Sequence, residues 1–441
     1  MKEEKIMAAA IGFLMIIVIV ALLLKGKMSP IVVLAIVPTI SALILGFVPT
    51  DILGFIADGI KTTTSNGILF IFSVIYFGVL SDTGLFDVIV NWLVKKAGNN
   101  VIAVTVVTAM IATIAHLDGT TAVTVLITIP AMYPVYKRMN IDARILLCIT
   151  GACMGVMNLL PWGGPTARAA TVLQMDATEL WHMLIPLQIV GLVMNSVIAV
   201  LLGMYAVKKG AGAGKGVEVE TNEKEKAETE ALKKSRGYLI FNFLLTVAVI
   251  AALSTGVGKS YVIFMLGLCV LLAVNYPDQK IQDKLVKKHA PAALIISATL
   301  FSAGAMVGIF DGTGMLTEMA NAIMSIIPGF LGQFIHIIFG ILALPLGLCI
   351  GTDAYFYGIM PLVMQVGETY GVASLSTALT MVIGKNLALM VSPLVPATYL
   401  AIGLTDVELK DHMKFSIPIY WGISIVMLVI GVILGIVPLG A

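Results

Sequence analysis

The chain has 441 residues, of which 59% are hydrophobic and only 12% are charged, and its formal net charge is +2. Its mean hydropathy of +1.02 lies far outside the range of soluble proteins. This composition excludes a soluble domain and predicts an all-α, polytopic membrane protein. The small net charge gives no indication of a nucleic-acid partner.

Apolar stretches begin at once and continue along the chain. The first, 7–24, has the length of a signal peptide, but it lacks a small-residue cleavage site and leads directly into a second span, so we expect a retained helix. We expect about 11–12 transmembrane segments, several of them shorter than a full crossing of the bilayer. The further candidates are 30–48, 68–80, 101–114, 145–160, 184–207, 239–253, 262–274, 292–310, 334–350, 375–391 and 417–437.

One hydrophilic segment divides the chain. Residues 208–237 are rich in Lys, Glu and Gly and cannot bury a core, which is typical of a linker. The positive-inside rule places it in the cytoplasm with the other basic loops, around Arg138, Lys284 and Lys410. Lys95 and Lys96 do not fit, because counting spans puts them outside. Segment 84–97 is alternatively a short or interfacial helix, and the orientation of the N-terminus stays open.

The two parts flanking the linker contain related sequences. SDTGLFDVI (81–89) resembles DGTGMLTEM (311–319), and Pro130 and Pro361 are 231 residues apart, as are Pro165 and Pro396. A constant offset of this kind indicates duplication. We therefore expect an N-terminal helix, 1–29, followed by two repeats. The repeats are 30–207 and 238–441.

Each repeat contains the same two irregular elements. A Gly/Asp/Thr cluster inside an apolar run predicts a re-entrant hairpin, and a Pro/Gly-interrupted run predicts a broken helix. The hairpins are expected at 115–135 and 348–367, and the broken helices at 145–175 and 375–404. Such backbone is tolerated at membrane depth only where protein or a water-filled cavity satisfies it. A single break would be read as an ordinary kink, but four paired breaks favour a substrate site.

The charge of the loops that follow the two clusters also predicts how the hairpins are oriented. The run after the first cluster ends just before a basic loop, whereas the run after the second ends near the acidic residue Glu368. The first hairpin then enters from the cytoplasm and the second from outside. The two repeats are therefore expected to have inverted topology.

Three stretches carry a resemblance to a known family: LDGTT (117–121), MNLLPWGGPTARAA (157–170) and GTDAYFYGIMPL (351–362). They resemble the citrate-metal/proton symporter, or citrate transporter (CitMHS), family of the ion-transporter superfamily, and the resemblance covers nearly the whole chain. It implies secondary uptake of citrate as a divalent-metal complex in symport with protons. It also implies an architecture similar to that of dimeric dicarboxylate carriers, in which a transport domain slides against a scaffold as an elevator.

The resemblance stops at the hairpin tips. The dicarboxylate carriers have Ser-Asn-Thr there, where it helps to bind sodium and a substrate carboxylate. This chain instead has Asp118-Gly-Thr-Thr and Thr352-Asp353. Sodium coupling is therefore not expected.

The candidate site residues come from the four irregular elements. Asp118 and Asp353 are costly at membrane depth, so we expect them to ligate the metal of the substrate or to carry protons, the alternative being helix caps. Cations, hydroxyls and amides can bind a polyanion, and glycines let the backbone approach it closely. Each of these residue types also occurs in helix packing. The substrate-binding candidates are Thr120, Thr121, Asn158, Gly163, Gly164, Thr166, Arg168, Thr352, Lys385, Asn386, Ser392 and Thr398.

Other polar residues are left out of the site. His116 and His336 are interpreted as packed, hydrogen-bonded histidines. Asp82 and Asp311, beside the TG pairs, are expected to cap the following helices. The four cysteines lie in apolar runs without zinc-site spacing, so we expect them in the core.

The sequence leaves three classes of function: a secondary transporter, a channel and a membrane-embedded enzyme. A channel needs a continuous polar pore, but the polar residues gather at the breaks. The enzyme motifs HExxH and GxSxG and the phosphate-binding motif GxxxxGK[ST] are absent. We therefore expect a homodimeric secondary transporter of the plasma membrane, not an enzyme, with no permanent cofactor. Magnesium and calcium suit the expected oxygen ligands equally. The alternative is a sodium- or proton-coupled carrier of another di- or tricarboxylate or organic acid.

Overall fold

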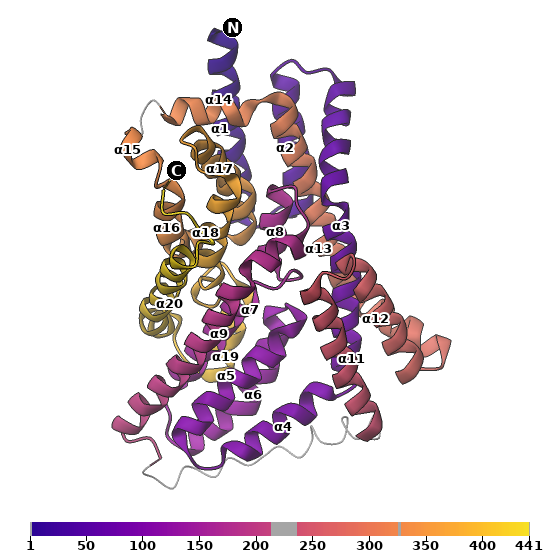
Figure 1. Ribbon diagram of the computed structural model, residues 1–441, viewed down its shortest axis with the longest axis vertical. Helices are drawn as coiled ribbons and strands as arrows, with labels where there is room; N and C mark the ends of the chain where they lie inside the picture. The colour runs from indigo at the N-terminus through magenta and orange to yellow at the C-terminus, as the bar shows by residue number, and fades with distance from the viewer. Residues whose placement is uncertain (1, 213–235, 325–327, 441) are drawn as a thin grey trace.

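The computed structural model describes residues 2–212, 236–324 and 328–440, and Figure 1 shows them as a bundle of helices. Most of the expected linker lies outside the described residues. Seven helices of the described chain are long and apolar enough to cross a membrane. They are α1 (Lys2–Lys25), α3 (Pro49–Asp82), α5 (Val101–Ala115, continued by the 3₁₀ turn η1, His116–Asp118), α9 (Ala177–Lys208), α11 (Arg236–Thr255), α13 (Gln279–Thr313) and α20 (Leu409–Ile433).

Shorter helices lie between these seven. The apolar ones are α2 (Pro30–Ile44), α7 (Ala143–Met157), α12 (Ser260–Asn275) and α16 (Ile335–Cys349). The others are α4 (Leu85–Ala97), α6 (Thr121–Arg138), α8 (Gly164–Val172), α14 (Met315–Met324), α15 (Gly329–Gly332), α17 (Met360–Thr369), α18 (Ser374–Asn386) and α19 (Pro396–Thr405), with the turns η4 (Ala354–Ile359) and η5 (Leu389–Val391). The all-α, polytopic fold class is confirmed.

Two helices are longer than the sequence indicated. The expected spans 68–80 and 292–310 are only the later parts of α3 and α13, whose earlier parts contain polar residues that lower the hydropathy. The two helices pack against each other along much of their length. Their contact depends on glycine, since a Cβ on Gly59 would lie 2.1 Å from the carbonyl oxygen of Gly304.

The elements follow the same order twice along the chain. Each half has three helices and a short helix (α1 to α4, then α11 to α14), a helical hairpin (α5–α6, then α16–α17), a broken helix (α7–α8, then α18–α19) and a long final helix (α9, then α20). Gly84 and Gly314 of the related TG pairs mark the same turn, with left-handed φ values of 76° and 66°.

Both hairpins begin earlier in the chain than the sequence indicated. The expected ranges, 115–135 and 348–367, leave out most of their first helices, α5 and α16. These helices are almost entirely apolar, so they were read as ordinary spans. The polar clusters are the turns between the two helices of each hairpin.

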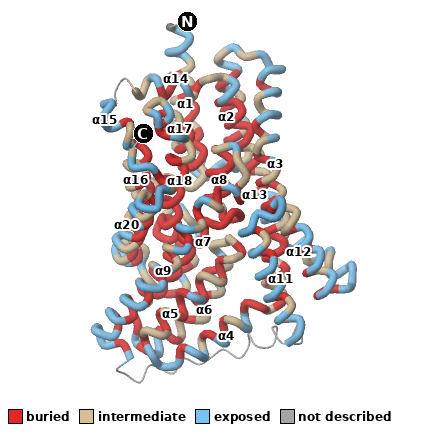
Figure 2. The backbone as a smooth tube through the Cα atoms, viewed as in Figure 1, coloured by how far each residue is buried: buried red, intermediate tan, exposed pale blue. Residues whose placement is uncertain are grey.

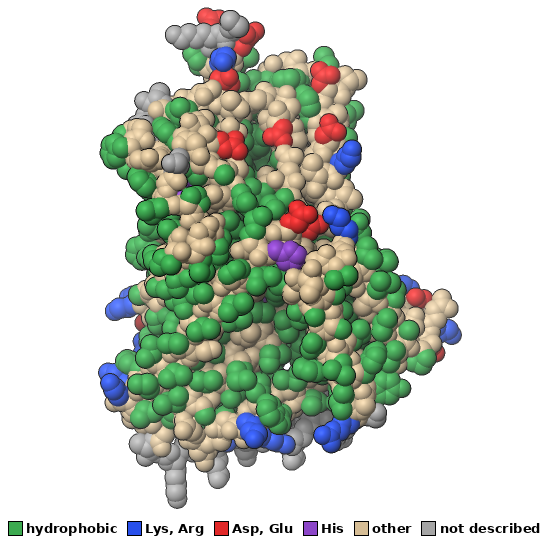
Figure 3. All heavy atoms as spheres, in the orientation of Figure 1, with side chains coloured by type: hydrophobic (Ala, Val, Ile, Leu, Met, Phe, Trp, Pro, Cys, Tyr) green, Lys and Arg blue, Asp and Glu red, His purple; other side chains and the backbone are tan. Residues whose placement is uncertain are grey.

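The two ends of the bundle differ in charge. In Figure 1, α4, α5 and α6 lie toward the lower end, whereas α14, α16 and α17 lie toward the upper end. Figure 3 shows Lys and Arg side chains gathered toward the lower end of this face and Asp and Glu toward the upper end. Lys95 and Lys96 belong to α4 and so lie at the basic end. The short-helix alternative for 84–97 is therefore the observed one.

The core lies where the broken helices cross. Figure 2 shows the most buried backbone around α7, α8 and α18, and every residue of α7 from Ile145 to Met157 is buried. The expectation that all cysteines lie in the core is half wrong. Cys148 and Cys153 on α7 are buried, but Cys269 and Cys349 are exposed because they face outward from their helices.

Candidate functional site

The first hairpin tip, residues 116–120, is a tight turn that binds its own carboxylate. Gly119 has a left-handed φ of 73°, which reverses the chain between η1 and α6. Asp118 is only 8% exposed. One of its oxygens accepts a hydrogen bond from the Thr120 amide (2.9 Å) and the other from the Thr120 hydroxyl (2.5 Å). Thr121, the first residue of α6, is half-buried.

His116 connects this tip to the broken helix of the same half. Its Nδ1 lies 2.6 Å from Thr124 Oγ1 and its Nε2 lies 3.2 Å from Asn158 Oδ1. Trp162 makes a second connection, because its indole N–H donates to the Leu117 carbonyl at 2.7 Å. The sequence predicts a packed, hydrogen-bonded histidine at this position. His116 is packed, but one of its partners, Asn158, is a predicted site residue.

The first break, residues 158–163, ends α7 and starts α8. Gly163 is required by the backbone itself, since a Cβ would lie 2.4 Å from the Asn158 carbonyl oxygen. The same carbonyl accepts a hydrogen bond from the Thr166 hydroxyl at 2.9 Å, so this side chain satisfies a group freed by the break. The Asn158 amide nitrogen is buried and has no partner in the described chain.

Arg168 on α8 joins the two halves. Its Nε donates to Asp353 Oδ1 at 2.6 Å, and the two side chains are 20% and 22% exposed. Gly164 leaves room for this arrangement, because a Cβ there would lie 2.8 Å from Arg168 Nη1. Within the described residues, the two amino nitrogens of Arg168 and the second oxygen of Asp353 have no hydrogen-bond partner. The pair therefore presents free donors and a free acceptor side by side.

The second hairpin tip, residues 350–353, precedes the π-helical turn η4. Thr352 and Asp353 are half-buried there. Lys385, in the last turn of α18, is 1% exposed and donates from Nζ to the Gly347 carbonyl at 3.0 Å. Its ammonium lies 5.7 Å from the centre of the Tyr355 ring. Helix α8, which carries Arg168, contacts both α18 and η4, so the structure brings Arg168, Asp353 and Lys385 into one region.

The second break, residues 387–395, resembles the first. The Thr398 hydroxyl donates to the Leu389 carbonyl at 3.2 Å, as Thr166 does in the first half. Ser392 donates to the Leu348 carbonyl at 3.4 Å and so links the break to the hairpin. Asn386 is buried, and neither amide atom has a partner among the described residues.

Comparison with known proteins shows the family of the chain. The profile of the citrate transporter family (CitMHS) matches residues 5–384. The chain is 35% identical over 431 residues to the citrate transporter of Bacillus subtilis (strain 168), covering 98% of this chain and 100% of that protein. It is 34% identical to the Mg(2+)/citrate complex secondary transporter of the same organism, covering 97% and 99%. The chain belongs to the citrate transporter family. It is a multi-pass membrane transporter, not an enzyme.

Two solved structures share the fold of this citrate transporter family member. The YdaH transporter of Alcanivorax borkumensis, described as having an unusual topology, has a TM-score of 0.58 at 14% identity, covering 87% of this chain and 89% of that one. MtrF of Neisseria gonorrhoeae has a TM-score of 0.58 at 13% identity, covering 85% and 82%. At these identities the likeness shows the fold alone.

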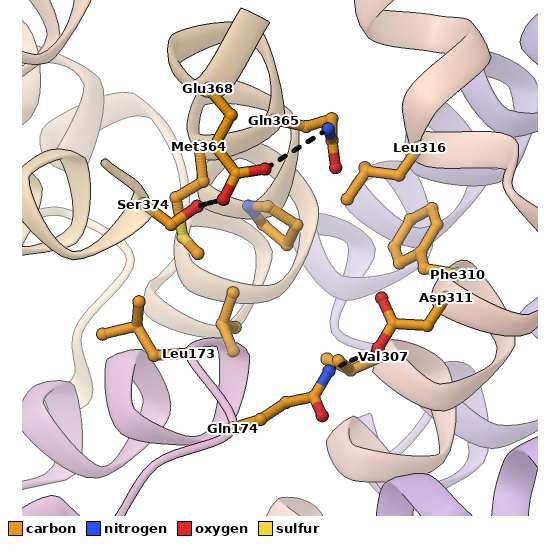
Figure 4. Close-up of a pocket in the computed structure, with 12 residues that line it drawn as sticks. Leu173, Gln174, Val307, Phe310, Asp311, Leu316, Met364, Gln365, Glu368 and Ser374 are labelled. Atoms are coloured by element: carbon orange, nitrogen blue, oxygen red, sulfur yellow. Dashed lines mark hydrogen bonds between the residues drawn. The ribbon is translucent and has the colours of Figure 1, made fainter. Parts of the chain in front are cut away.

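A cavity of about 230 Å³ begins one helical turn beyond Arg168, between α8, α13, α14 and α17. Figure 4 shows Gln174 pointing across it to donate a hydrogen bond to Asp311, and Glu368 accepting from Ser374 at 2.6 Å. The prediction that Asp82 and Asp311 cap the next helices is wrong, because glycines at the ends of α3 and α13 make those turns. Asp82 instead binds Lys288 and His289, at 2.5 and 2.8 Å.

The described residues contain no cluster of three or more His, Cys, Asp or Glu that would hold a metal ion on its own. The carboxylates at the tips, Asp118 and Asp353, belong to different hairpins. Carboxylates and hydroxyls are the hard oxygen donors that magnesium and calcium prefer. They fit a metal that arrives with oxygen ligands already supplied by a substrate.

Proposed function

We propose that this member of the citrate transporter family takes up citrate as a complex with a divalent cation, in symport with protons. The observation that carries the proposal is the Arg168–Asp353 pair, which joins the two halves and leaves two guanidinium nitrogens and one carboxylate oxygen without partners in the described chain. Guanidinium nitrogens bind carboxylates in a fork, and a carboxylate oxygen binds a hard metal. A metal–citrate complex offers both partners together.

The charges favour the complex over free citrate. Arg168, Lys385 and Asp353 together carry about one net positive charge when ionised, whereas fully ionised citrate carries about three negative charges. A divalent metal reduces that excess to about one negative charge, which the cluster balances. The similarity to a protein named Mg(2+)/citrate complex secondary transporter supports the same cargo.

Asp118 is the residue that we propose for the proton or for the second contact with the metal. It lies at the first tip, where Thr120 already holds both oxygens. A carboxylate oxygen can accept more than one contact, so metal binding and these hydrogen bonds are compatible. The remaining predicted residues, Thr121, Thr352, Asn158, Asn386 and Ser392, line the tips and breaks from which the substrate pocket is proposed to form.

We also propose that the two halves are inverted repeats, with the hairpins re-entrant from opposite sides. The repeated order of elements and the placement of the hairpins at opposite ends support this (Figure 1). The shared order includes α1 as the counterpart of α11. We therefore propose that the first repeat, expected at 30–207, also includes the N-terminal helix, 1–29, whereas the second stays at 238–441.

The movement we propose is an elevator in a homodimer. Helices α2, α3, α12 and α13 pack together as the scaffold, and the hairpins and broken helices form the moving part. Asn66 on α3 marks the contact between them: its side chain donates to the Met175 carbonyl (3.0 Å) in the loop after α8 and accepts from the amide of Ala177 (2.9 Å), the first residue of α9. The cavity beside Asp311 lies along the same boundary and is proposed as the entry route.

Uptake into liposomes tests this proposal. Purified protein with labelled citrate at constant total concentration is expected to require magnesium or calcium, to be indifferent to replacement of sodium by choline, and to be stimulated by an inward proton gradient. Saturation at a low turnover separates a carrier from a channel. Full uptake under chelation, driven by a sodium gradient, would contradict the metal complex and favour the alternative, a sodium-coupled carrier of citrate or another di- or tricarboxylate.

A further inference from the structure

In the second half, a lysine lies where two helices end. Helices α16 and α18 stop within a few residues of Gly347 and Lys385, and both turn their last carbonyls toward the second tip and break. The carboxyl end of a helix carries about half a negative charge on carbonyls that have no partner inside the helix. The Lys385 ammonium binds one of these carbonyls, that of Gly347.

The space around Lys385 is built for it. A Cβ on Gly347 would lie 2.6 Å from Lys385 Cδ and 3.2 Å from Nζ, so only glycine leaves room for the side chain. Neighbouring Asn386 is 1% exposed and has no partner for its amide oxygen in the described chain. A buried ammonium is costly unless its surroundings are polar or negative. Here a carbonyl, an aromatic ring and two helix ends supply that environment.

The side chains near the Lys385 ammonium come from the second tip, η4 and α8. Tyr355 of η4 has its ring 5.7 Å from the ammonium, Asp353 lies just before η4, and Arg168 lies on α8. Asp353 is already engaged by Arg168 at 2.6 Å. Among the described residues the ammonium therefore has no carboxylate of its own, and it donates to the Gly347 carbonyl.

The first half also has a nitrogen-bearing side chain between the corresponding helix ends, but it comes from the hairpin and not from the broken helix. His116 follows the carboxyl end of α5 and contacts Asn158, the residue that caps the carboxyl end of α7. Each half thus fills the gap between the end of its first hairpin helix and the end of its broken helix with a side chain of its own. In the second half that side chain is a cation.

We propose that Lys385 is a built-in monovalent cation: its ammonium occupies a cation site formed by the carboxyl ends of α16 and α18. The chain then needs no dissolved sodium or potassium ion at this position. Removing the side chain is expected to leave an empty site of the right chemistry for a small cation. The inference goes beyond the proposed function, and it concerns cation binding whatever the substrate.

The test compares Lys385→Ala, which empties the site, with Lys385→Met, which fills it without charge. Thermal unfolding of the purified variants is followed with sodium, with n-propylammonium, which replaces the lost atoms, and with tetramethylammonium, which has no N–H group. For Lys385→Ala we expect a saturable rise in melting temperature with sodium or n-propylammonium and none with tetramethylammonium. The wild type and Lys385→Met are expected to show no such rise.

Liposome uptake provides the second measurement. We expect both variants to lose about 30-fold or more in citrate uptake and Lys385→Ala to regain about tenfold when n-propylammonium or sodium is added. Wild-type uptake by Lys385→Met, or an unchanged melting temperature of Lys385→Ala in both cations, overturns the proposal. If Lys385→Ala does not fold, Lys385→Ser carries the same test. Absence of citrate uptake by the wild type would instead contradict the proposed function, and the melting experiment would still decide this inference.

Discussion

The two hairpin tips have the same place in their halves but opposite ways of using a carboxylate. At the first tip, Thr120 takes both oxygens of Asp118 within a single turn. At the second tip, Asp353 reaches out of its own half to Arg168 and keeps one oxygen without a partner in the described chain. The two halves therefore share an order of elements but differ in chemistry: the first tip satisfies its own carboxylate, and the second is paired through Arg168 on α8 of the first half.

The two tips are therefore expected to respond differently to substitution. A self-contained turn keeps its shape when the other half moves or is altered. A bridge between halves couples the position of α8 to that of the second hairpin, so a change at either end affects both. Substitutions at the bridge and at the first tip therefore test this contrast.

The largest effect is expected for Arg168→Ala. It leaves the Asp353 carboxylate without its cation in a site that is about four-fifths buried, and it removes the fork proposed to bind citrate. We expect uptake to fall by about 100-fold or more and the free energy of unfolding to fall by about 2–3 kcal/mol. Uptake and chemical denaturation of the same preparation measure the two effects.

A matched pair of variants separates structure from binding. Arg168→Ala combined with Asp353→Asn removes both charges, so stability is expected to recover by about 1–2 kcal/mol while uptake stays lost. Arg168→Lys keeps the charge without the fork and is expected to lose about tenfold. Normal uptake by the double variant would show that the pair is structural only.

The next largest effect is expected at the first tip. Asp118→Asn keeps an acceptor for the Thr120 amide, so the turn is expected to survive with less than about 1 kcal/mol lost. Uptake is expected to fall by about 30-fold, with more metal needed for half-maximal rate, because a ligand charge is gone. Thr120→Val is the control, since it removes the 2.5 Å hydrogen bond and keeps the carboxylate. Equal losses in both variants would assign the effect to the turn.

Much of this architecture could be read from the sequence because the signals were local. Gly, Pro, Asp and Thr inside apolar runs marked both tips and both breaks, and the constant 231-residue offset predicted two halves, which have the same order of elements. The family followed from the same stretches and is confirmed by the match over residues 5–384.

What the sequence could not supply is which side chains meet. Arg168 and Asp353 are 185 residues apart, and nothing near either residue announces the other. Thr166 and Gly163 looked like ligand-contacting residues, yet both lie against the Asn158 carbonyl because the break folds back on itself. The early parts of α3 and α13 were missed because they contain charged residues, such as Asp58, Lys61 and Lys284, which are exposed and lower the hydropathy.

A smaller effect is expected for His116, the first-half counterpart of Lys385. His116→Leu leaves the Asn158 amide without any partner, so we expect about 2 kcal/mol of destabilisation and about a tenfold loss of uptake. His116→Gln can still reach Asn158 and is expected to recover most of the stability. Melting temperatures of the two variants provide the comparison. An equal loss in both would mean that ring packing, not the link to Asn158, is what matters.

The smallest and most symmetric effect is expected for Thr166 and Thr398. Each hydroxyl donates back across its break, Thr166 to the Asn158 carbonyl and Thr398 to the Leu389 carbonyl, at 2.9 and 3.2 Å. Because the single hydroxyl proton is used in this way, neither side chain can also donate to a citrate carboxylate. Alanine at either position is expected to cost about 1 kcal/mol and about threefold in uptake, and serine is expected to restore both. The affinity for metal–citrate, measured by calorimetry, should not change. A selective loss of affinity in Thr166→Ala, with stability retained, would place that hydroxyl on the substrate and would show that the two breaks differ as the two tips do.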